Sequence, residues 1–227
     1  MKHRFLWLCL AIAAPSAALS NNFDRTLEEI EDDWAFASYA IKDSDLRATA
    51  FVSLSKRTRA FVAANPQRAE PLIWNGIVES TLADTTGGLT AWRHANEARR
   101  QLEAALRIDD GALRGSAYVS LGTLYFKEPG FPIGFGSKKK AFRFLKKALE
   151  LDPDGIDSNF CYAKYLLDQG ESVTAQEYLQ RGLQAHDRPG RPLVDRRRRT
   201  EIRSLLDKIG VDRSGGLPQP PPFLMFI

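Results

Sequence analysis

The stretch IDSNFCYAKYLLDQGESVTAQEYLQRGLQA, residues 156–185, decides the fold, because it contains two helices and the turn between them. Residues of matching size recur on both sides of Gln169-Gly170, a dipeptide typical of a turn. Small residues stand where two helices cross closely, and large ones fill the gaps between them. The stretch therefore predicts an antiparallel helical hairpin. The recurring residues are Ala163, Leu166, Ala175, Leu179 and Gly182.

The preceding segment repeats this pattern. YVSLGTLY (118–125) places Gly122 in a first helix, at the position that Ala163 takes in the next hairpin. Pro153 then ends the second helix, because proline cannot continue it. The second helix carries Ala141, Leu145 and Ala148 at the expected spacing.

The segment EPGFPIGFGS (128–137) separates these two helices and is longer than the Gln169-Gly170 turn. Its prolines interrupt the first helix, and Ser137 is a suitable N-cap for the second. We therefore expect an enlarged turn inside one hairpin. Its apolar residues are expected to cover the hairpin, with contact to a partner as the alternative. These residues are Phe131, Ile133 and Phe135.

The glycines of this segment, followed by Ser137 and Lys138, raise the question of a phosphate-binding loop. That signature needs Gly-Lys-Ser/Thr after four intervening residues and a preceding strand. Here the order is Gly-Ser-Lys and a helix precedes it, so nucleotide binding is disfavoured.

A third, weaker unit lies upstream, with helices expected at 69–82 and 90–110 and an enlarged turn, DTTGGL, at 84–89. The small crossing residue of its first helix is ambiguous. It is Gly76 in one register and Val78 in the other.

Together these units resemble the tetratricopeptide repeat (TPR), a helix pair of about 34 residues. The resemblance implies an all-α fold, a TPR-like right-handed superhelix of antiparallel helix pairs. The predicted repeats are 67–110, 111–153 and 154–186, the first two with enlarged turns.

Further helices flank the repeats. Residues 21–66 predict an N-terminal helical pair, with apolar stripes through Phe23 and Ile30 in the first helix. In the second helix the stripe is expected to run through Leu46, Ala50, Leu54 and Phe61. Residues 187–212 predict a C-terminal capping helix, and 213–227 a proline-rich tail that ends in FLMFI. Because free apolar residues gain by burial, we expect this tail to dock in the groove or on a partner.

Residues 1–20 are typical of a cleaved export signal. A charged start precedes the apolar run FLWLCLAIAA, and small residues then offer cleavage after Ala18 or Ser20. The apolar run is short for a bilayer span, although an uncleaved anchor is the alternative. We therefore expect a periplasmic protein without stable membrane insertion after cleavage.

The TPR resemblance implies that a protein or peptide partner binds the concave face, which is lined by the first helix of each repeat. The alternative is that some of these side chains pack against neighbouring helices. In the second repeat the lining residues are Ser116, Val119, Thr123 and Phe126. In the third repeat they are Asp157, Phe160, Lys164 and Leu167.

A narrower resemblance concerns residues 132–170 and 188–206, which look like exported bacterial TPR proteins akin to the T component associated with TRAP-type solute transporters. That resemblance implies a non-enzymatic scaffold, or an accessory protein that holds a small solute for a transporter.

The residues favour no catalysis and no cofactor. His94 and His186 belong to different repeats, and no Cys/His/Asp cluster has metal-ligand spacing. Cys161, the only cysteine left after signal removal, is expected to be a buried small thiol rather than a nucleophile.

The charges favour no nucleic acid either. The whole chain carries +4, and losing Lys2 and Arg4 with the signal brings the excess to +2. The basic runs KKK (138–140) and RRRR (196–199) are expected to be solvated, and otherwise to bind acidic lipid or a partner surface.

Overall fold

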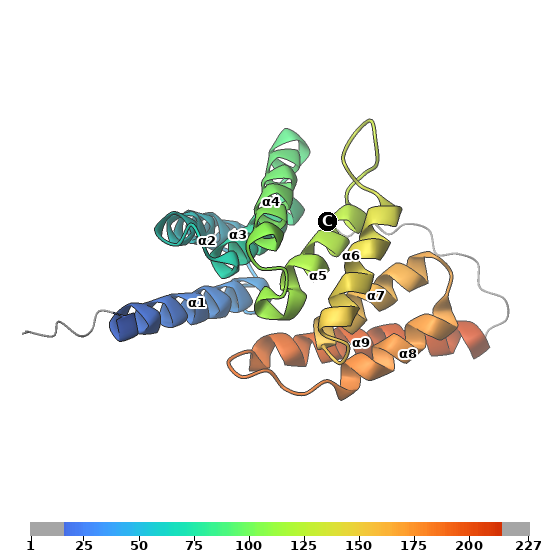
Figure 1. Cartoon of the computed structure of the whole chain (residues 1–227). Helices are drawn as coiled ribbons and strands as arrows, with labels where there is room; N and C mark the ends of the chain where they lie inside the picture. The colour runs from blue at the N-terminus through green and yellow to red at the C-terminus, as the bar shows by residue number, and fades with distance from the viewer. Residues whose placement is uncertain (1–15, 215–227) are drawn as a thin grey trace, which may run out of the picture.

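The computed structural model describes the backbone of residues 16–214 and the side chains of residues 21–210, and the regular elements within these ranges are helices. The first eight helices form four successive pairs, and a ninth follows them (Figure 1). This confirms the predicted all-α fold. The helices are α1 (Ser16–Tyr39), α2 (Ser44–Ala64), α3 (Ala69–Thr85), α4 (Gly88–Ile108), α5 (Ala112–Lys127), α6 (Lys138–Leu151), α7 (Ile156–Asp168), α8 (Ser172–Gln184) and α9 (Pro192–Ser214).

Most of the predicted signal segment and of the apolar tail lies outside the described residues. Helix α1 begins at Ser16, within the predicted signal, and α9 ends at Ser214. None of the helices described between these limits combines the length and the hydropathy that a bilayer crossing requires.

Two glycines set the distance between paired helices. A Cβ on Gly76 of α3 would lie 2.6 Å from Cγ of Leu102 in α4, and a Cβ on Gly122 of α5 would lie 2.6 Å from Cγ of Leu145 in α6. No real Cβ tolerates such a contact, so each crossing needs a glycine. The ambiguous register of the first repeat is thereby resolved in favour of Gly76.

The fourth pair, α7 and α8, uses alanines in the same role. Ala163 in α7 and Ala175 in α8 are fully buried, and Leu179 fills the space beside them. The crossing positions expected from residues 156–185 thus lie at the contact between α7 and α8.

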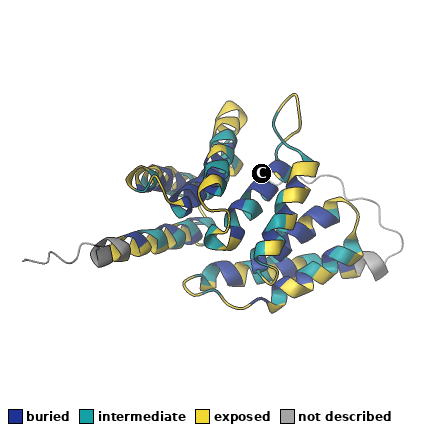
Figure 2. Cartoon of the chain, in the orientation of Figure 1, coloured by how far each residue is buried: buried dark blue, intermediate teal, exposed yellow. Residues whose placement is uncertain are grey.

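The buried side chains form two main clusters that meet at α3 (Figure 2). The larger cluster extends from α3 to α9 and includes Leu102, Leu121, Leu145 and Leu179. The other joins α1, α2 and α3 around Ile30, Phe51 and Trp74. Ile77 of α3 packs against both clusters and so couples the N-terminal pair to the repeats.

The expected enlarged turn at 84–89 was wrong. Helix α3 continues to Thr85 and α4 begins at Gly88, so the extra residues lengthen the helices instead. The hydroxyls of Thr85 and Thr86 both donate to the Leu82 carbonyl, which closes the end of α3 without a long loop.

The apolar stripe of α2 is rotated from the expected one. Leu54 and Phe61 are buried as predicted, but Leu46 is exposed and Phe51 is buried instead. The polar residues Ser55 and Thr58 complete the buried face, because they hydrogen-bond to residues of α3. A stripe defined by apolar residues alone therefore missed its true direction.

The enlarged turn at 128–137 is present, and Ser137 caps α6 by accepting a hydrogen bond from the Lys140 amide at 3.3 Å. The apolar residues of this turn differ in how far they are buried. Phe135 is half-buried and packs edge-on against Tyr125, with 5.4 Å between ring centroids. Phe131 and Ile133 stay exposed, so the expectation that all three cover the hairpin was wrong for these two.

Helix α9 returns to the start of the chain. Arg191, just before α9, lies 3.5 Å from the Glu31 carboxylate of α1, and Arg197 donates to the Tyr39 carbonyl at 3.2 Å. Figure 1 shows the end of α1 beside the start of α9. The first and last helices of the described chain are therefore in contact.

Candidate functional site

The residues predicted for the concave face lie on α5 and α7, the first helices of their pairs, and we call the surface that these residues would share the inner face. The structure gives these residues two different environments. The half of α7 that begins with Asp157 is covered by α9, and the half that ends with Leu167 is not.

Phe160 and Asp157 lie in the covered half. Phe160 is only 5% exposed, and the Arg198 guanidinium of α9 stands 4.1 Å from its ring centroid. Asp157 accepts from Arg198 and from Arg188, each at 2.7 Å. For these two residues the alternative of packing against a neighbouring helix holds.

The charges of this contact form a continuous network. Arg188 also pairs with the buried Asp195, and Arg198 also pairs with Glu201. Burial alone would raise the pKa of Asp157, but the attraction of Arg198 and Arg188 outweighs it and holds that pKa well below its usual range. Asp157 is therefore a carboxylate at neutral pH.

The expectation that all of the RRRR run is solvated was wrong for two of its members. Arg196 and Arg197 are exposed, whereas Arg198 and Arg199 have side chains that are 17% exposed. Arg199 donates to the Ala185 carbonyl at 2.7 Å. The run therefore fastens α9 to α7 and α8, in addition to carrying a polar outer face.

The N-terminal helix contributes a tyrosine to the same region. Burial raises the pKa of Tyr39, and the charges of Arg198, Glu201, Asp157 and Arg191 act on its hydroxyl. The covered half of the face is thus where α1, α7 and α9 meet.

The uncovered half offers four of the predicted residues. Lys164 is exposed, and its ammonium lies 5.5 Å from the Phe160 ring centroid. Thr123, Phe126 and Leu167 are half-buried. Phe126 packs edge-on against Tyr165 with 6.0 Å between ring centroids, which fixes its ring at the boundary of the core.

Cys161 lies between these two halves and is half-buried. Burial raises the pKa of its thiol, against the attraction of Arg198, and the Thr123 hydroxyl interacts with it. A thiol with a raised pKa is mostly protonated at neutral pH and is a poor nucleophile.

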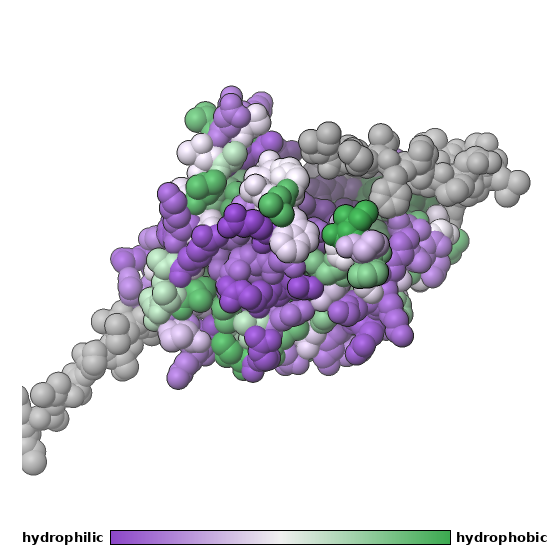
Figure 3. Space-filling view, turned by 90° about the horizontal axis from the view of Figure 1, so that it is seen from above, coloured by the Kyte–Doolittle hydropathy of each residue, from purple (hydrophilic) through white to green (hydrophobic). Residues whose placement is uncertain are grey.

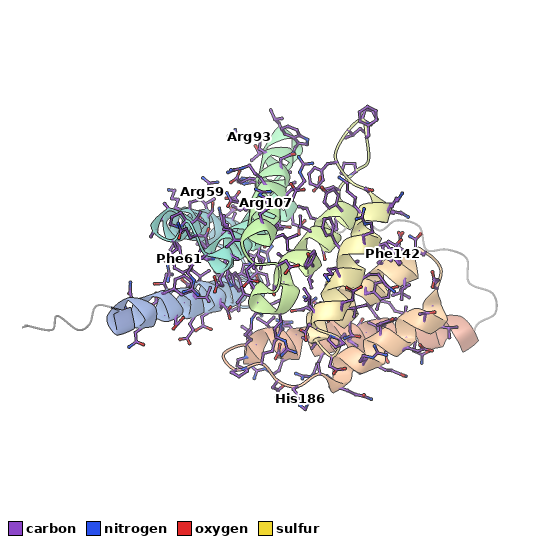
Figure 4. The ribbon with its side chains drawn as sticks, viewed as in Figure 1. Arg59, Phe61, Arg93, Arg107, Phe142 and His186 are labelled. Atoms are coloured by element: carbon purple, nitrogen blue, oxygen red, sulfur yellow. The ribbon has the colours of Figure 1, made fainter. Side chains whose placement is uncertain are left out.

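The two histidines of the described chain are separated. His94 is on α4, and His186, which is labelled in Figure 4, follows α8. Among the described residues, no group of three or more His, Cys, Asp and Glu side chains is placed to hold a metal ion.

Sequence reasoning missed a buried carboxylate on α3. Glu79 is fully buried, and it accepts from the Ser55 hydroxyl and from Arg59 of α2 at 2.7 Å each. His94 Nδ1 of α4 lies 2.6 Å from its other oxygen. Figure 4 shows Arg59 on α2. These residues are far apart in the sequence, so no local spacing could have linked them, and their evident effect is to join α2, α3 and α4.

The comparisons with known proteins agree with the repeat pattern. A tetratricopeptide repeat model matches residues 144–177, which include all of α7 and parts of α6 and α8. Comparison with curated proteins yields no significant sequence match.

Two solved structures are similar to parts of this arrangement. One is MamA, with 18% identity and a TM-score of 0.45 over 77% of this chain and 96% of that one. The other is pilF of Pseudomonas aeruginosa, with 15% identity and a TM-score of 0.35 over 86% of this chain and 94% of that one. The matched repeat and the paired helices around it make this an all-α protein that contains a tetratricopeptide repeat within a TPR-like fold.

Proposed function

We propose that the protein is a non-catalytic scaffold that binds a protein or peptide through the uncovered half of its inner face. Helix-pair repeats of this kind serve as protein-interaction scaffolds through extended inner surfaces. The proposed surface consists of Thr123, Phe126, Lys164 and Leu167.

The observation that supports this choice is the position of Lys164. Its side chain is exposed, and within the described residues it forms no ion pair, whereas the neighbouring Asp157 has two. Helix α9 covers the face at Asp157 and Phe160 but leaves the Lys164 side chain accessible to a ligand. The preferred ligand is an extended segment with an apolar side chain and a carboxylate.

A crosslinking experiment tests this surface. A photoreactive amino acid at position 164 should form a discrete adduct with a protein in intact cells. The matched control is position 208, where Lys208 is also exposed but lies on α9. Equal adducts at both positions, or none at 164, would contradict the proposal. Phe126→Ala should reduce the adduct at 164, because it removes an apolar member of the proposed surface.

The second candidate is an accessory protein of a TRAP-type solute transporter. It is supported by the sequence resemblance of residues 132–170 and 188–206. Under this alternative, native mass spectrometry of the purified protein should reveal a retained small molecule. Its loss in a Lys164→Glu variant would favour the solute over a protein partner.

We also propose that the protein acts in the periplasm after cleavage of its N-terminal segment. The N-terminal sequence of protein from the periplasmic fraction should begin at Leu19, after cleavage behind Ala18, or at Asn21, after cleavage behind Ser20. Recovery of the uncleaved chain with the membrane fraction would instead support an anchor.

The apolar end of the predicted tail is proposed to dock, either in the same groove or on the partner. Deletion of 217–227 should lower the melting temperature in the first case and partner recovery in the second. An unchanged melting temperature, solubility and partner recovery would remove this part of the proposal.

A further inference from the structure

Large apolar side chains are exposed at one end of the molecule. Phe131 and Ile133, at the tip of the 128–137 loop, are 94% and 76% exposed. Leu89 and Trp92, at the start of α4, are 73% and 47% exposed. Figure 2 shows exposed residues at the upper end of α4 and along the loop, and both point the same way in Figure 1. We name these four residues the tip surface.

Two contacts hold the two parts of the tip surface together. Lys127, at the end of α5, pairs at 2.5 Å with Asp84, near the end of α3. The Arg99 guanidinium of α4 stands 4.4 Å from the Phe135 ring centroid at the base of the loop. The turn between α3 and α4 therefore lies beside the loop between α5 and α6.

The loop is a built structure with a fixed stem. The Gly136 amide donates to the Pro129 carbonyl at 2.8 Å, and the Ser137 amide donates to the Tyr125 carbonyl at 2.8 Å. A Cβ on Gly136 would overlap the Glu128 carbonyl oxygen, so the close approach of the two sides of the stem needs glycine. The stem therefore holds the tip of the loop, with Phe131 and Ile133, away from the rest of the protein.

Basic residues accompany the tip surface. Arg93 lies at the upper end of α4 (Figure 4), and Lys138, Lys139 and Lys140 form the first turn of α6, directly after the loop. Cations oppose the dipole at a helix N-terminus, and this turn contains no acidic residue to offset them. The three lysines therefore cost α6 some stability. Lys138 pairs with Asp168 and Lys140 contacts Tyr125, which leaves Lys139, within the described part of the chain, exposed without such a partner.

The acidic groups nearby are largely engaged. Asp84 is paired with Lys127, and Asp168 is paired with Lys138. Burial raises the pKa of Glu128, and the charge of Asp84 acts in the same direction. Arg93 and Lys139 are exposed and, within the described residues, have no carboxylate partner. Figure 3, which looks down on this end, shows hydrophobic atoms standing among hydrophilic ones.

We propose that the tip surface binds reversibly to a lipid bilayer that contains anionic lipids. Phe131, Ile133 and Leu89 enter the boundary between headgroups and acyl chains, and Trp92 occupies the interfacial level that suits its ring. Arg93 and Lys139 bind lipid phosphates. The apolar residues protrude singly from two separate turns, and a fluid interface accepts such a shape without a preformed groove.

Vesicle flotation tests the proposal with the full chain. The protein should float with phosphatidylcholine vesicles of which about a third of the lipid is phosphatidylglycerol, and less with phosphatidylcholine alone. Phe131→Ser with Ile133→Ser should lower the bound fraction at least about tenfold, because two inserted apolar side chains are lost. Both residues are exposed, so the fold should be unaffected.

The matched control is Val52→Ser with Ile108→Ser. These residues are 48% and 42% exposed, but they lie in the middle of α2 and at the other end of α4. This control should float like the wild type. All variants keep both chain termini, so a difference between them reports on the loop and not on the terminal segments.

A second measurement locates the contact. In a Trp92→Phe background, tryptophan placed by Phe131→Trp should add quenching by brominated lipid that the Trp92→Phe protein lacks, and Arg93→Glu with Lys139→Glu should reduce flotation with anionic vesicles only. Absence of flotation, equal flotation of the loop variant and its control, or no added quenching from tryptophan at 131 would each overturn the proposal. If vesicles do not bind but a purified partner protein does, and that binding requires Phe131, the tip surface is a protein-binding surface instead.

Discussion

The contact between α5 and α6 and the contact between α7 and α9 rest on opposite kinds of chemistry. The first is made by the absence of a side chain, since Gly122 lets Leu145 approach to within a distance that no Cβ would allow. The second is made by long charged side chains, since Arg198 and Arg188 reach across to Asp157. The contact between α5 and α6 sets the distance between two paired helices. The contact between α7 and α9 holds the last helix against the repeats.

The largest effect should come from filling the first contact. In Gly122→Val the Cβ would lie 2.6 Å from Leu145 Cγ and 3.2 Å from the Leu145 backbone nitrogen, and the branch adds two further methyl groups. The helices must separate, so we expect a loss of about 3 kcal/mol in the free energy of unfolding. Urea denaturation followed by circular dichroism measures it.

Gly87→Val is the control for this prediction. Gly87 is the N-cap of α4, with extended backbone angles and open space around it, so valine causes no clash and should cost less than about 1 kcal/mol as a poorer cap. If both variants lose the same stability, the close approach at Gly122 is not what holds α5 to α6.

The second contact should be weaker but still measurable. In Arg198→Ala, Asp157 keeps only Arg188, and Phe160 loses its cover. Because both charged side chains are partly accessible, we expect a loss of about 2 kcal/mol, below the range for fully buried pairs. Thermal and urea unfolding of the purified variant measure it.

Arg196→Ala controls for the loss of a charge on the same helix, since Arg196 is exposed, and it should be close to neutral. A cycle with Asp157→Ala isolates the pair. A coupling below about 0.5 kcal/mol would mean that apolar packing, and not the ion pair, fastens α9.

These two contacts also differ in how far they could be predicted from the sequence. The small residues of the crossings recur at fixed spacing, so the helices and their pairing could be predicted, and Gly76 needed only its neighbour Leu102 to settle the register. The direction of the buried stripe of α2 could not be predicted, because Ser55 and Thr58 are buried through hydrogen bonds to α3 that no apolar pattern reveals.

The candidate site was only half predictable for the same reason. Repeat positions supplied the candidate residues on α5 and α7, but the return of α9 on to α7 depends on Arg198 and Asp157, which are far apart in the chain. The arginine run looked like a solvated surface because a charge pattern does not say which members find a partner. The exposure of Phe131 likewise depends on the glycine stem of its loop.

Acid should weaken the contact between α7 and α9 before it affects the contact between α5 and α6. The folded-state pKa of Asp157 is lowered, so its contribution to stability is present above the unfolded pKa of about 3.9 and is lost as the pH falls below it. The difference in unfolding free energy between wild type and Asp157→Asn should therefore be largest near pH 7 and should narrow at pH 3. A constant difference would show that the charge of Asp157 is not what α9 requires.

The smallest effect is expected at Gly182, which lies where the two kinds of contact meet. A Cβ there would be 3.1 Å from Cδ1 of Ile202 in α9, the flexible end of a side chain, and 3.6 Å from its next neighbours. Gly182→Ala gains about 1 kcal/mol of helix propensity, which should offset the small movement of Ile202 and leave stability within about 0.5 kcal/mol of wild type. A loss as large as that of Gly122→Val would mean that α9 is held as rigidly as a repeat helix. If Gly182→Ala is as stable as the wild type, the close-packed repeats end at the contact of α8 with α9, and α9 is held mainly by its charged side chains.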